Sequence, residues 1–255
     1  MIDLHCHLLP GIDDGPPDFG AALALARMQL DAGVHTVVAT PHVHPDIPND
    51  AAGIARAVEE LRFALERAEL PLRVVPGAEV DLVKAVELPE DELRALALGG
   101  GEWLLVEAPL YAMPFAREAI ERVLGRGFHV VLAHPERSPS LQRDIPALSF
   151  LASLGVRMQL TASSLTGQFG RDVQRYSHEL AAAGLVHVVS SDAHDTIRRP
   201  PGLLPAIDQA GWSDAASFLT ELIPGAILDG EQIPAVPILP QPRRGLGGLL
   251  SRRAR

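Results

Sequence analysis

Short apolar, β-branched runs alternate along this chain with helix-like runs. The strand-like runs lie at residues 1–7, 36–39, 73–75, 103–106, 129–133, 157–160 and 187–190. The helix candidates cover residues 18–31, 51–69, 115–125, 170–183 and 213–222, with Asp18 and Ser213 as expected caps and Gly33, Gly127 and Gly184 as expected stops. A repeated strand-then-helix order predicts a parallel sheet wrapped by helices, so we expect the α/β class.

The length of the chain fits a single α/β barrel better than two ordinary domains. With 255 residues, of which 47% are hydrophobic, the chain can bury a substantial core. After Asp229 the sequence becomes rich in proline and glycine, so we expect one domain over residues 1–230 and an extended or disordered tail over residues 231–255. The tail ends in Arg243, Arg244, Arg252, Arg253 and Arg255. These arginines provide either solvated charge or a contact to an acidic partner or an anionic membrane surface.

The charge balance argues against nucleic acid as a partner. The chain has 22 basic and 32 acidic residues, a net charge of -10, whereas affinity for a phosphate backbone depends on clustered Lys and Arg. A small phosphorylated substrate remains compatible with this balance. The single cysteine, Cys6, rules out an intramolecular disulfide framework, and the sequence has neither a signal-peptide pattern nor an apolar stretch of about 18 residues. We therefore expect a cytoplasmic protein.

Potential metal ligands lie at the ends of six of the seven strand-like runs. In the first run, His5 and His7 are two residues apart and point to the same face of a strand, whereas Cys6 points away. The full set is His5, His7, Asp14, His42, Glu79, Glu107, His134, Asp192 and His194. In α/β barrels the chemistry lies at the carboxyl ends of the strands, and imidazole and carboxylate ligands without thiolate suit manganese, iron or zinc. The sequence therefore predicts a multi-metal site.

Several longer motifs contain these residues. They are HCHLLPGIDDGP at residues 5–16, TPH at 40–42, GAE at 77–79, AHPER at 133–137 and SDAH at 191–194. As a set they resemble the PHP (polymerase and histidinol phosphatase) superfamily, and within it the manganese-dependent tyrosine-protein phosphatases of bacterial capsule and exopolysaccharide loci. The resemblance runs from Met1 to about Gly230 and includes SLTGQFG at residues 164–170.

This resemblance implies a distorted, TIM-like (β/α)7 barrel, the PHP fold, that holds three divalent ions, usually manganese. Carried over by position, the first ion takes His5, His7, Glu79 and Asp192, the second takes Glu79, Glu107 and His134, and the third takes Asp14, His42 and His194. The two phosphate-binding arginines of the family match Arg137 and Arg199. Asp13 and Arg198 are the adjacent alternatives to Asp14 and Arg199.

The chemistry of such a site suits a phosphomonoester. A divalent metal lowers the pKa of bound water to about 7, so a metal-bridging hydroxide can attack phosphorus without an unusual catalytic base. Four carboxylates, three divalent ions and two arginines leave a net charge of roughly +4 for this hydroxide and a phosphate dianion. The resemblance implies a protein-tyrosine phosphatase, a phosphoric monoester hydrolase, whose substrate is a phosphotyrosine protein, namely the bacterial tyrosine kinase that regulates capsule or exopolysaccharide synthesis.

Three other functions stay open at this stage. A small-molecule phosphatase such as histidinol-phosphate phosphatase would use the same metal cluster. A PHP nuclease would need a basic groove, which the acidic balance disfavours. A non-catalytic metal-binding barrel would not require all nine ligands and both arginines.

Some individual residues also have two interpretations. His44 either contacts the substrate or supports a metal ligand, or it is structural. Tyr111 and Phe115 either line the entrance or pack against a helix. Ser163 and Ser164 either bind phosphate or cap a loop. We expect Cys6 to pack in the barrel wall. We expect structural or exposed positions for His35, His129, His178 and His187.

Overall fold

The computed structural model describes residues 1–142 and 144–240 of the 255-residue chain. Its strands are β1 (Ile2–Cys6), β2 (Thr36–Ala39), β3 (His42–Val43), β4 (Arg73–Pro76), β5 (Glu79–Asp81), β6 (Trp103–Glu107), β7 (His129–Ala133), β8 (Arg157–Thr161) and β9 (Val188–Ser190). They pair in parallel, in the orders β1-β2-β4 and β3-β5-β6-β7-β8-β9.

These strands form the seven staves of a barrel, as the sequence predicts, because two of the staves each consist of two consecutive strands. β2 continues through Thr40 and Pro41 into β3, and β4 continues through Gly77 and Ala78 into β5. A Cβ atom at Gly77 would lie 2.8 Å from Cγ1 of Val38, so only glycine allows the two staves to approach this closely. Because β2 and β4 pair in the first sheet and β3 and β5 pair in the second, each of these two staves belongs to both sheets.

Backbone hydrogen bonds between the first and the last stave close the ring. The N–H of Asp192 donates to the carbonyl of His5 (2.8 Å), and the N–H of His7 donates to the carbonyl of Ala193 (2.9 Å). Cys6 and Ala193 form a parallel bridge at the same place. The expected α/β class and distorted (β/α)7 barrel are thus confirmed.

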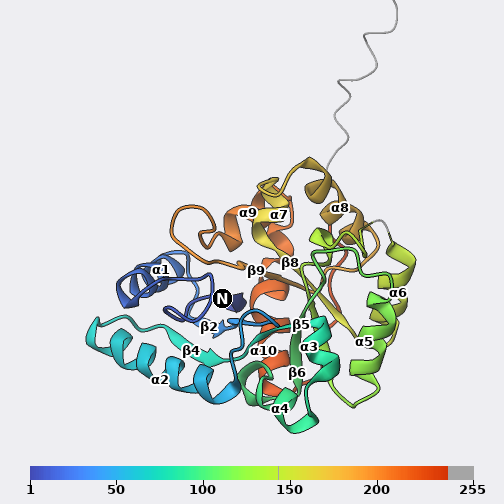
Figure 1. The fold of residues 1–255 in the computed structure, drawn as a ribbon. Helices are drawn as coiled ribbons and strands as arrows, with labels where there is room; N and C mark the ends of the chain where they lie inside the picture. Colours follow the sequence, from blue (N-terminus) through green and yellow to red (C-terminus); the bar gives the residue numbers. More distant parts are fainter. Residues whose placement is uncertain (143, 241–255) are drawn as a thin grey trace, which may run out of the picture.

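Helices surround the ring of strands (Figure 1). They are α1 (Phe19–Asp31), α2 (Ala51–Arg67), α3 (Leu82–Glu87), α4 (Glu90–Ala95), α5 (Ala116–Leu124), α6 (Ile145–Ser153), α7 (Ala162–Thr166), α8 (Arg171–Ala182), α9 (Leu203–Gln209) and α10 (Ile223–Asp229). Four of the five predicted helices are confirmed as α1, α2, α5 and α8. Asp18 caps α1 by accepting from the N–H of Ala21 at 2.9 Å, and Gly33, Gly127 and Gly184 follow their helices with positive φ.

The fifth predicted helix, over residues 213–222, is wrong as one helix. The structure has a 3₁₀ turn at Ser213–Ala215 and a π turn at Phe218–Leu222 that continues into α10. Pro224 has no N–H to donate to the carbonyl of Thr220, and this widens the turn. Ser213 is not the cap, because its hydroxyl donates to Asp208 at 2.6 Å.

Apolar residues form two separate clusters, one outside and one inside the ring of strands. The outer cluster lies between the strands and the surrounding helices. The inner cluster lies inside the barrel, and α10 contributes Ile223 and Ile227 to it. Since Gly225 of α10 lies beside Ile2 at the start of β1, α10 closes the amino-terminal end of the barrel. The carboxyl ends of the staves are left free for a site.

Residues 231–240 run along the barrel without forming a helix or strand. Leu239 is buried there, and the indole N–H of Trp212 donates to the carbonyl of Pro240 at 3.0 Å. The domain boundary at residue 230 stays a prediction, and the tail arginines lie outside the described residues. Among the described helices, none is long and apolar enough to cross a membrane.

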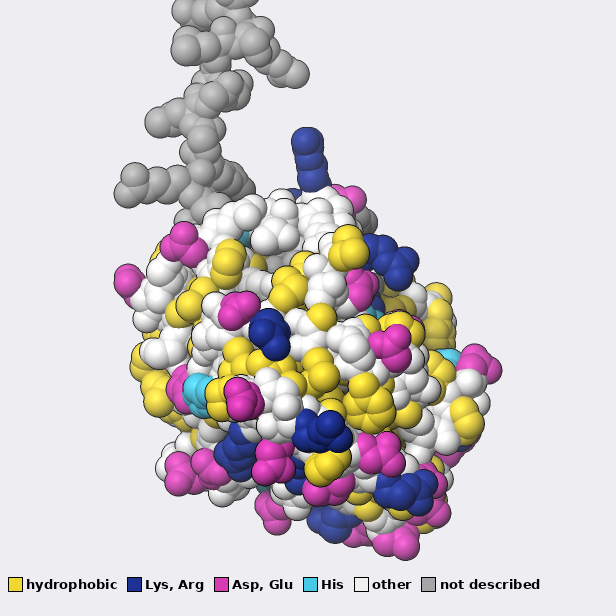
Figure 2. Space-filling model, turned by 90° about the vertical axis from the view of Figure 1, so that its left-hand side faces the viewer, with side chains coloured by type: hydrophobic (Ala, Val, Ile, Leu, Met, Phe, Trp, Pro, Cys, Tyr) yellow, Lys and Arg dark blue, Asp and Glu magenta, His cyan; other side chains and the backbone are white. Residues whose placement is uncertain are grey.

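The surface formed by α1 and α2 carries an apolar groove of about 800 Å³. This side lies at the left of Figure 1 and faces the viewer in Figure 2, where hydrophobic side chains gather among charges of both signs. Phe19, Leu23 and Phe63 line the groove, with Glu59 and Glu60 beside them. None of the nine predicted ligands lines it.

Candidate metal centre

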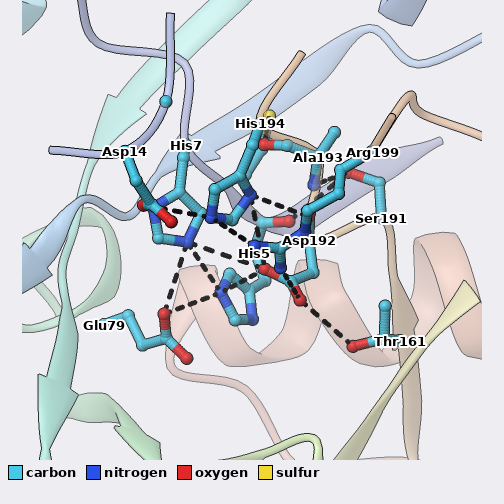
Figure 3. A network of polar contacts seen from close by, with 12 residues as sticks. His5, His7, Asp14, Glu79, Thr161, Ser191, Asp192, Ala193, His194 and Arg199 are labelled. Carbon is cyan, nitrogen blue, oxygen red and sulfur yellow. Dashed lines mark hydrogen bonds and ion pairs between the residues drawn. The ribbon is translucent and has the colours of Figure 1, made fainter. Parts of the chain in front are cut away.

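The nine predicted ligands converge at the carboxyl ends of the staves. Figure 3 shows His5, His7, Asp14, Glu79, Asp192 and His194 pointing toward one another. Four groups each have ligand atoms within 4.8 Å of one another, namely His7, Asp14, His42 and His194; His5, Glu79 and His134; His5, His7 and Asp192; and His42, Glu79 and Glu107. The structure therefore brings every one of the nine residues into a place that could hold a cation.

A carboxylate oxygen at the centre of the cluster has the surroundings of a cation site. Oε2 of Glu79 is buried, has no hydrogen-bond partner, and faces nitrogen atoms of three histidines. Nε2 of His5 and Nε2 of His7 both lie at 3.3 Å, and Nδ1 of His42 lies at 3.2 Å. Imidazole nitrogens around an unpaired carboxylate oxygen form a donor set that suits a divalent transition metal. The residues present therefore fit the metal that the resemblance implies.

The grouping of the ligands agrees in part with the allocation that the resemblance implies. Asp14, His42 and His194 form one group as expected, but His7 also belongs to it. Glu79 appears in two groups, which matches its expected role as a shared ligand. The assignment of residues to particular ions remains a proposal.

Two residues outside the predicted set orient the imidazoles. Nδ1 of His5 bonds to Oε1 of Gln159 at 3.0 Å, and Nδ1 of His7 donates to Oδ2 of Asp13 at 2.7 Å. Each bond places the proton on Nδ1 and leaves Nε2 as a ligand. Gln159 was missed by sequence reasoning, and its signal is a polar side chain within the apolar run of β8. The sequence offers Asp13 only as an alternative to Asp14.

The structure separates the roles of the two adjacent aspartates. Oδ2 of Asp13 also accepts from the N–H of His42 (3.1 Å), and Oδ1 accepts from the N–H of Gly15 (2.9 Å), so both oxygens of Asp13 are used. Oδ1 of Asp14 instead lies 3.2 Å from Nε2 of His194. Asp14 is thus the aspartate that reaches the ligand atoms.

Arg199, rather than Arg198, points into the cluster. Nη2 of Arg199 donates to Oδ2 of Asp192 at 2.5 Å, and Nη1 of Arg137 donates to the same oxygen at 2.6 Å. Nη1 of Arg199 also donates to Nε2 of His194 at 2.8 Å. The side chain of Arg198 is 89% exposed and turned away. Two guanidinium groups therefore meet beside the candidate ligands, where an anion could bind.

The carboxylates of the cluster differ in their affinity for protons. Burial raises the pKa of Asp192, but attraction to His5 and Arg199 outweighs burial and holds this pKa well below the usual range. Burial and the negative charge of Glu79 together raise the pKa of Glu107 to about 9. Without cations, Glu107 therefore keeps a proton at neutral pH.

The histidines of the cluster also differ in their affinity for protons. Burial lowers the pKa of His7, but hydrogen bonds to carboxylates, first that of Asp13, outweigh burial and raise the pKa to about 10. Burial lowers the pKa of His134 to about 4, and it also lowers the pKa of His42 and of His194. The latter three are therefore neutral imidazoles at pH 7, which is the form that binds metals.

The backbone adopts unusual conformations at two candidate ligands. His134 has φ of 35° and Asp192 has φ of 51°, both in the left-handed region that non-glycine residues rarely adopt. Hydrogen bonds from their N–H groups to the carbonyls of Gln159 and His5, both 2.8 Å, hold these turns in place. Strain of this kind is typical of functional sites.

A pocket of about 300 Å³ opens beside the cluster. Asp14, His42 and Glu107 contribute to it, together with the apolar side chains of Leu110 and Tyr111. Tyr111 is 48% exposed. The pocket therefore joins candidate ligands to an apolar wall at the mouth of the barrel.

The remaining sequence candidates take different positions. His44 and Tyr111 both line this pocket, whereas Phe115 is 71% exposed in a neighbouring groove. Ser164 is buried, and its hydroxyl donates to Glu136 at 2.7 Å, which supports a structural role. Cys6 packs in the outer apolar cluster as expected. The four remaining histidines, His35, His129, His178 and His187, belong to none of the ligand groups found among the described residues.

Known proteins are similar to this chain in sequence. Residues 1–212 match the family described as capsular polysaccharide synthesis, CpsB/CapC. The tyrosine-protein phosphatase YwqE of Bacillus subtilis is 34% identical over 201 residues, which are 78% of this chain and 79% of that protein. The putative tyrosine-protein phosphatase CapC of Staphylococcus aureus is 30% identical over 202 residues, 78% of this chain and 79% of that protein.

Solved structures agree with the sequence comparison. One match comes from the structures of YwqE from Bacillus subtilis and CpsB from Streptococcus pneumoniae, which are described as unique metal-dependent tyrosine phosphatases. It superposes with a TM-score of 0.83 and 31% sequence identity, and it covers 95% of this chain and 100% of that chain. A dihydropyrimidinase of Brevibacillus agri, 11% identical with a TM-score of 0.53 over 95% of this chain and 73% of its own, shares the fold alone. The predicted resemblance is confirmed: this chain belongs to the CpsB/CapC family.

Proposed function

We propose that this protein is a metal-dependent protein-tyrosine phosphatase, a phosphoric monoester hydrolase. The observation that carries the proposal is the unpaired oxygen of Glu79, which faces three imidazole nitrogens beside two converging arginines. The imidazole nitrogens around the Glu79 oxygen suit cations, and the two arginines suit a phosphate. Membership in a family whose relatives are named tyrosine-protein phosphatases supports the same function.

The nine converging residues are the proposed ligands of three divalent ions, with manganese preferred and iron or zinc as alternatives. They are His5, His7, Asp14, His42, Glu79, Glu107, His134, Asp192 and His194. When bound, such ions supply an activated water for attack on phosphorus and offset the charge of the buried carboxylates.

Arg137 and Arg199 are the proposed phosphate-binding residues. Each guanidinium group uses only part of its N–H donors on Asp192, so others remain for phosphate oxygens. Arg199 also donates to Nε2 of His194, which is a proposed ligand atom. If His194 held a cation through this nitrogen, the N–H of Arg199 would be free to donate to the substrate.

The mouth of the barrel suits an aromatic phosphate ester. The pocket there has an apolar wall that includes Leu110 and Tyr111, and proposed ligands line its other side. An aromatic ring can lie against this wall while the phosphate points to the cluster. The phenol that leaves has a pKa of about 10, far below that of an aliphatic alcohol, so its departure needs little help from a general acid.

The proposed substrate is a tyrosine-phosphorylated protein in the cytoplasm, namely the tyrosine kinase that acts in capsule or exopolysaccharide synthesis. The family description supports the link to capsular polysaccharide synthesis. The open pocket supports a flexible peptide as substrate, because a small-molecule phosphatase gains more from enclosing its substrate. Histidinol phosphate remains the main competing substrate.

Removing the ions is expected to lower the melting temperature by about 10 °C or more. The buried carboxylates repel one another without cations, and a single ion present at about 1,000 times its dissociation constant stabilises the folded state by about 4 kcal/mol. The test compares the protein before chelation, after chelation with metal content verified, and after manganese is restored. An unchanged midpoint in verified metal-free protein would contradict the cluster.

Manganese affinity is expected to increase with pH between about pH 6 and pH 9. The raised pKa values of Glu107 and His7, about 9 and about 10, mean that both groups hold protons in the ion-free protein. A cation must displace these protons, so lower pH weakens binding. Calorimetric titrations at about pH 6, 7 and 8, each in two buffers of different ionisation enthalpy, measure both the affinity and the protons released. Affinity that is independent of pH, without proton release, contradicts the assignment of these two ligands.

Substitutions at the cluster are expected to separate metal ligands from phosphate ligands. We expect His134→Ala to lose metal and to abolish hydrolysis. We expect Arg199→Ala to keep metal and to lower kcat/KM about 100-fold. Arg199→Lys restores only part of kcat/KM, because an ammonium group lacks the planar fork of a guanidinium group. Arg198→Ala is the matched control and keeps full activity. If Arg198→Ala is instead the variant with lowered kcat/KM, then Arg198 rather than Arg199 binds phosphate. Full activity of His134→Ala with intact metal content removes His134 from the site.

A substrate panel tests the proposed function directly. We expect manganese-loaded protein to hydrolyse a phosphotyrosine peptide with a kcat/KM at least about 100-fold above that for the matching phosphoserine peptide, because of the better leaving group and the apolar wall. Histidinol phosphate and short single-stranded DNA complete the panel under one metal condition. A preference for histidinol phosphate, or DNA cleavage without phosphotyrosine turnover, overturns the proposed function while leaving the metal cluster in place.

A further inference from the structure

We propose that the loop between α7 and α8 positions both phosphate-binding arginines through Gln168 and Phe169. This inference rests on the proposed function, in which Arg137 and Arg199 bind phosphate. Gln168 and Phe169 belong to the SLTGQFG motif at residues 164–170, and no residue of this motif belongs to the candidate ligand groups. They act as positioning residues, because each contacts an arginine segment rather than a candidate ligand.

Phe169 supports the guanidinium group of Arg137 from one face. The Cζ atom of Arg137 lies 4.4 Å from the centroid of the Phe169 ring. A ring in this position attracts the cation and leaves the N–H groups at the edge of the guanidinium plane free. One of these groups, on Nη1, donates to Asp192 at 2.6 Å. The ring therefore sets the plane of Arg137 without competing for its donors.

Gln168 holds the turn that carries Arg199. The side-chain amide of Gln168 donates to the carbonyl of Arg198, the residue directly before Arg199. Within the turn, Oδ1 of Asp195 accepts from the N–H groups of Ile197 and Arg198. Gln168 provides a contact from outside the turn, so it fixes the position of the turn relative to the barrel.

The base of the loop is attached to the same segment that carries Arg137. Oε1 of Glu136 is fully buried and accepts from the N–H of Thr161 (3.0 Å) and from the hydroxyl of Ser164 (2.7 Å), both at the start of α7. Glu136 directly precedes Arg137. One buried carboxylate thus connects the Arg137 segment to α7, and the loop that follows α7 returns to the guanidinium group.

Two glycines and one side chain shape the loop. Gly167 has φ of +83° and Gly170 has φ of +97°, conformations that L side chains rarely adopt. The side-chain amide of Gln174 in α8 donates to the carbonyl of Leu165 at 2.8 Å, which connects α8 back to α7. α7, α8 and α9 lie together on one side of the barrel, and the turn with Arg199 precedes α9 (Figure 1). The loop therefore has a defined shape between the two arginine segments.

A substitution series at Phe169 tests whether the ring acts through Arg137. Phe169→Leu keeps an apolar side chain but removes the ring, and Phe169→Tyr keeps the ring. Phe150→Leu is a matched control, since Phe150 supports Arg117 in the same way (5.7 Å from Cζ to the ring centroid) on the outer helices α5 and α6. Each manganese-loaded variant is measured for the dissociation constant of inorganic phosphate, manganese affinity, melting temperature and kcat/KM for a phosphotyrosine peptide.

We expect Phe169→Leu to weaken phosphate binding about 10-fold and to lower kcat/KM to a similar extent, with manganese affinity unchanged. Phe169→Tyr and Phe150→Leu stay within about twofold of the parent protein. In an Arg137→Ala background, Phe169→Leu causes no further loss, because the group through which it acts is gone. Gln168→Met, which removes the donor, weakens phosphate binding about threefold to fivefold.

The outcomes separate this inference from the proposed function. If Phe169→Leu lowers only the melting temperature, or weakens phosphate binding equally in the Arg137→Ala background, the loop is merely structural and the inference is overturned. If phosphate binding depends on Phe169 through Arg137 but phosphotyrosine is not hydrolysed, the positioning role is supported and the proposed function fails.

Discussion

The carboxylate of Glu79 is the group on which the rest of the site depends. It is buried at the centre of the barrel mouth, with one oxygen on His134 at 2.7 Å and the other facing three histidines without a hydrogen bond. A charge in such a place is stable only if compensated, and the surrounding imidazoles and carboxylates are arranged for cations to do this. The protonation of Glu107 in the ion-free protein is a second consequence of the same crowding, because burial and the charge of Glu79 raise the pKa of Glu107.

A second layer of contacts keeps this cluster in one geometry. Gln159 and Asp13 set the orientation of His5 and His7, and backbone hydrogen bonds hold the left-handed turn at Asp192. The contacts of His5 with Gln159 and with the N–H of Asp192 join segments that are far apart in sequence, including the first and last staves. Closure of the barrel and formation of the site are therefore the same event, which explains why metal binding and folding stability should be coupled.

Much of the architecture was predictable from local sequence. Seven apolar runs formed seven staves, and four of the predicted helices formed, three of them ending before the predicted stop glycines. The failure at residues 213–222 has a local cause, because Pro224 removes a hydrogen bond and produces a π turn. All nine proposed ligands were also named from sequence, since eight lie near the end of a parallel stave and Asp14 lies in the loop that follows β1, and parallel strands bring their carboxyl ends to one edge of the fold.

What the sequence by itself determined was the α/β class, the seven staves and the identity of the residues that gather at their ends, because these follow from periodicity and spacing along the chain. Only the tertiary structure separated the contacts of Asp13 from those of Asp14, and the contacts of Arg198 from those of Arg199, since neighbours in sequence point to different partners once a turn forms. It also revealed Gln159 as a partner of His5 and Phe169 as a support for Arg137. Such roles depend on contacts across the barrel, and no local pattern specifies which distant side chain will lie within hydrogen-bonding distance.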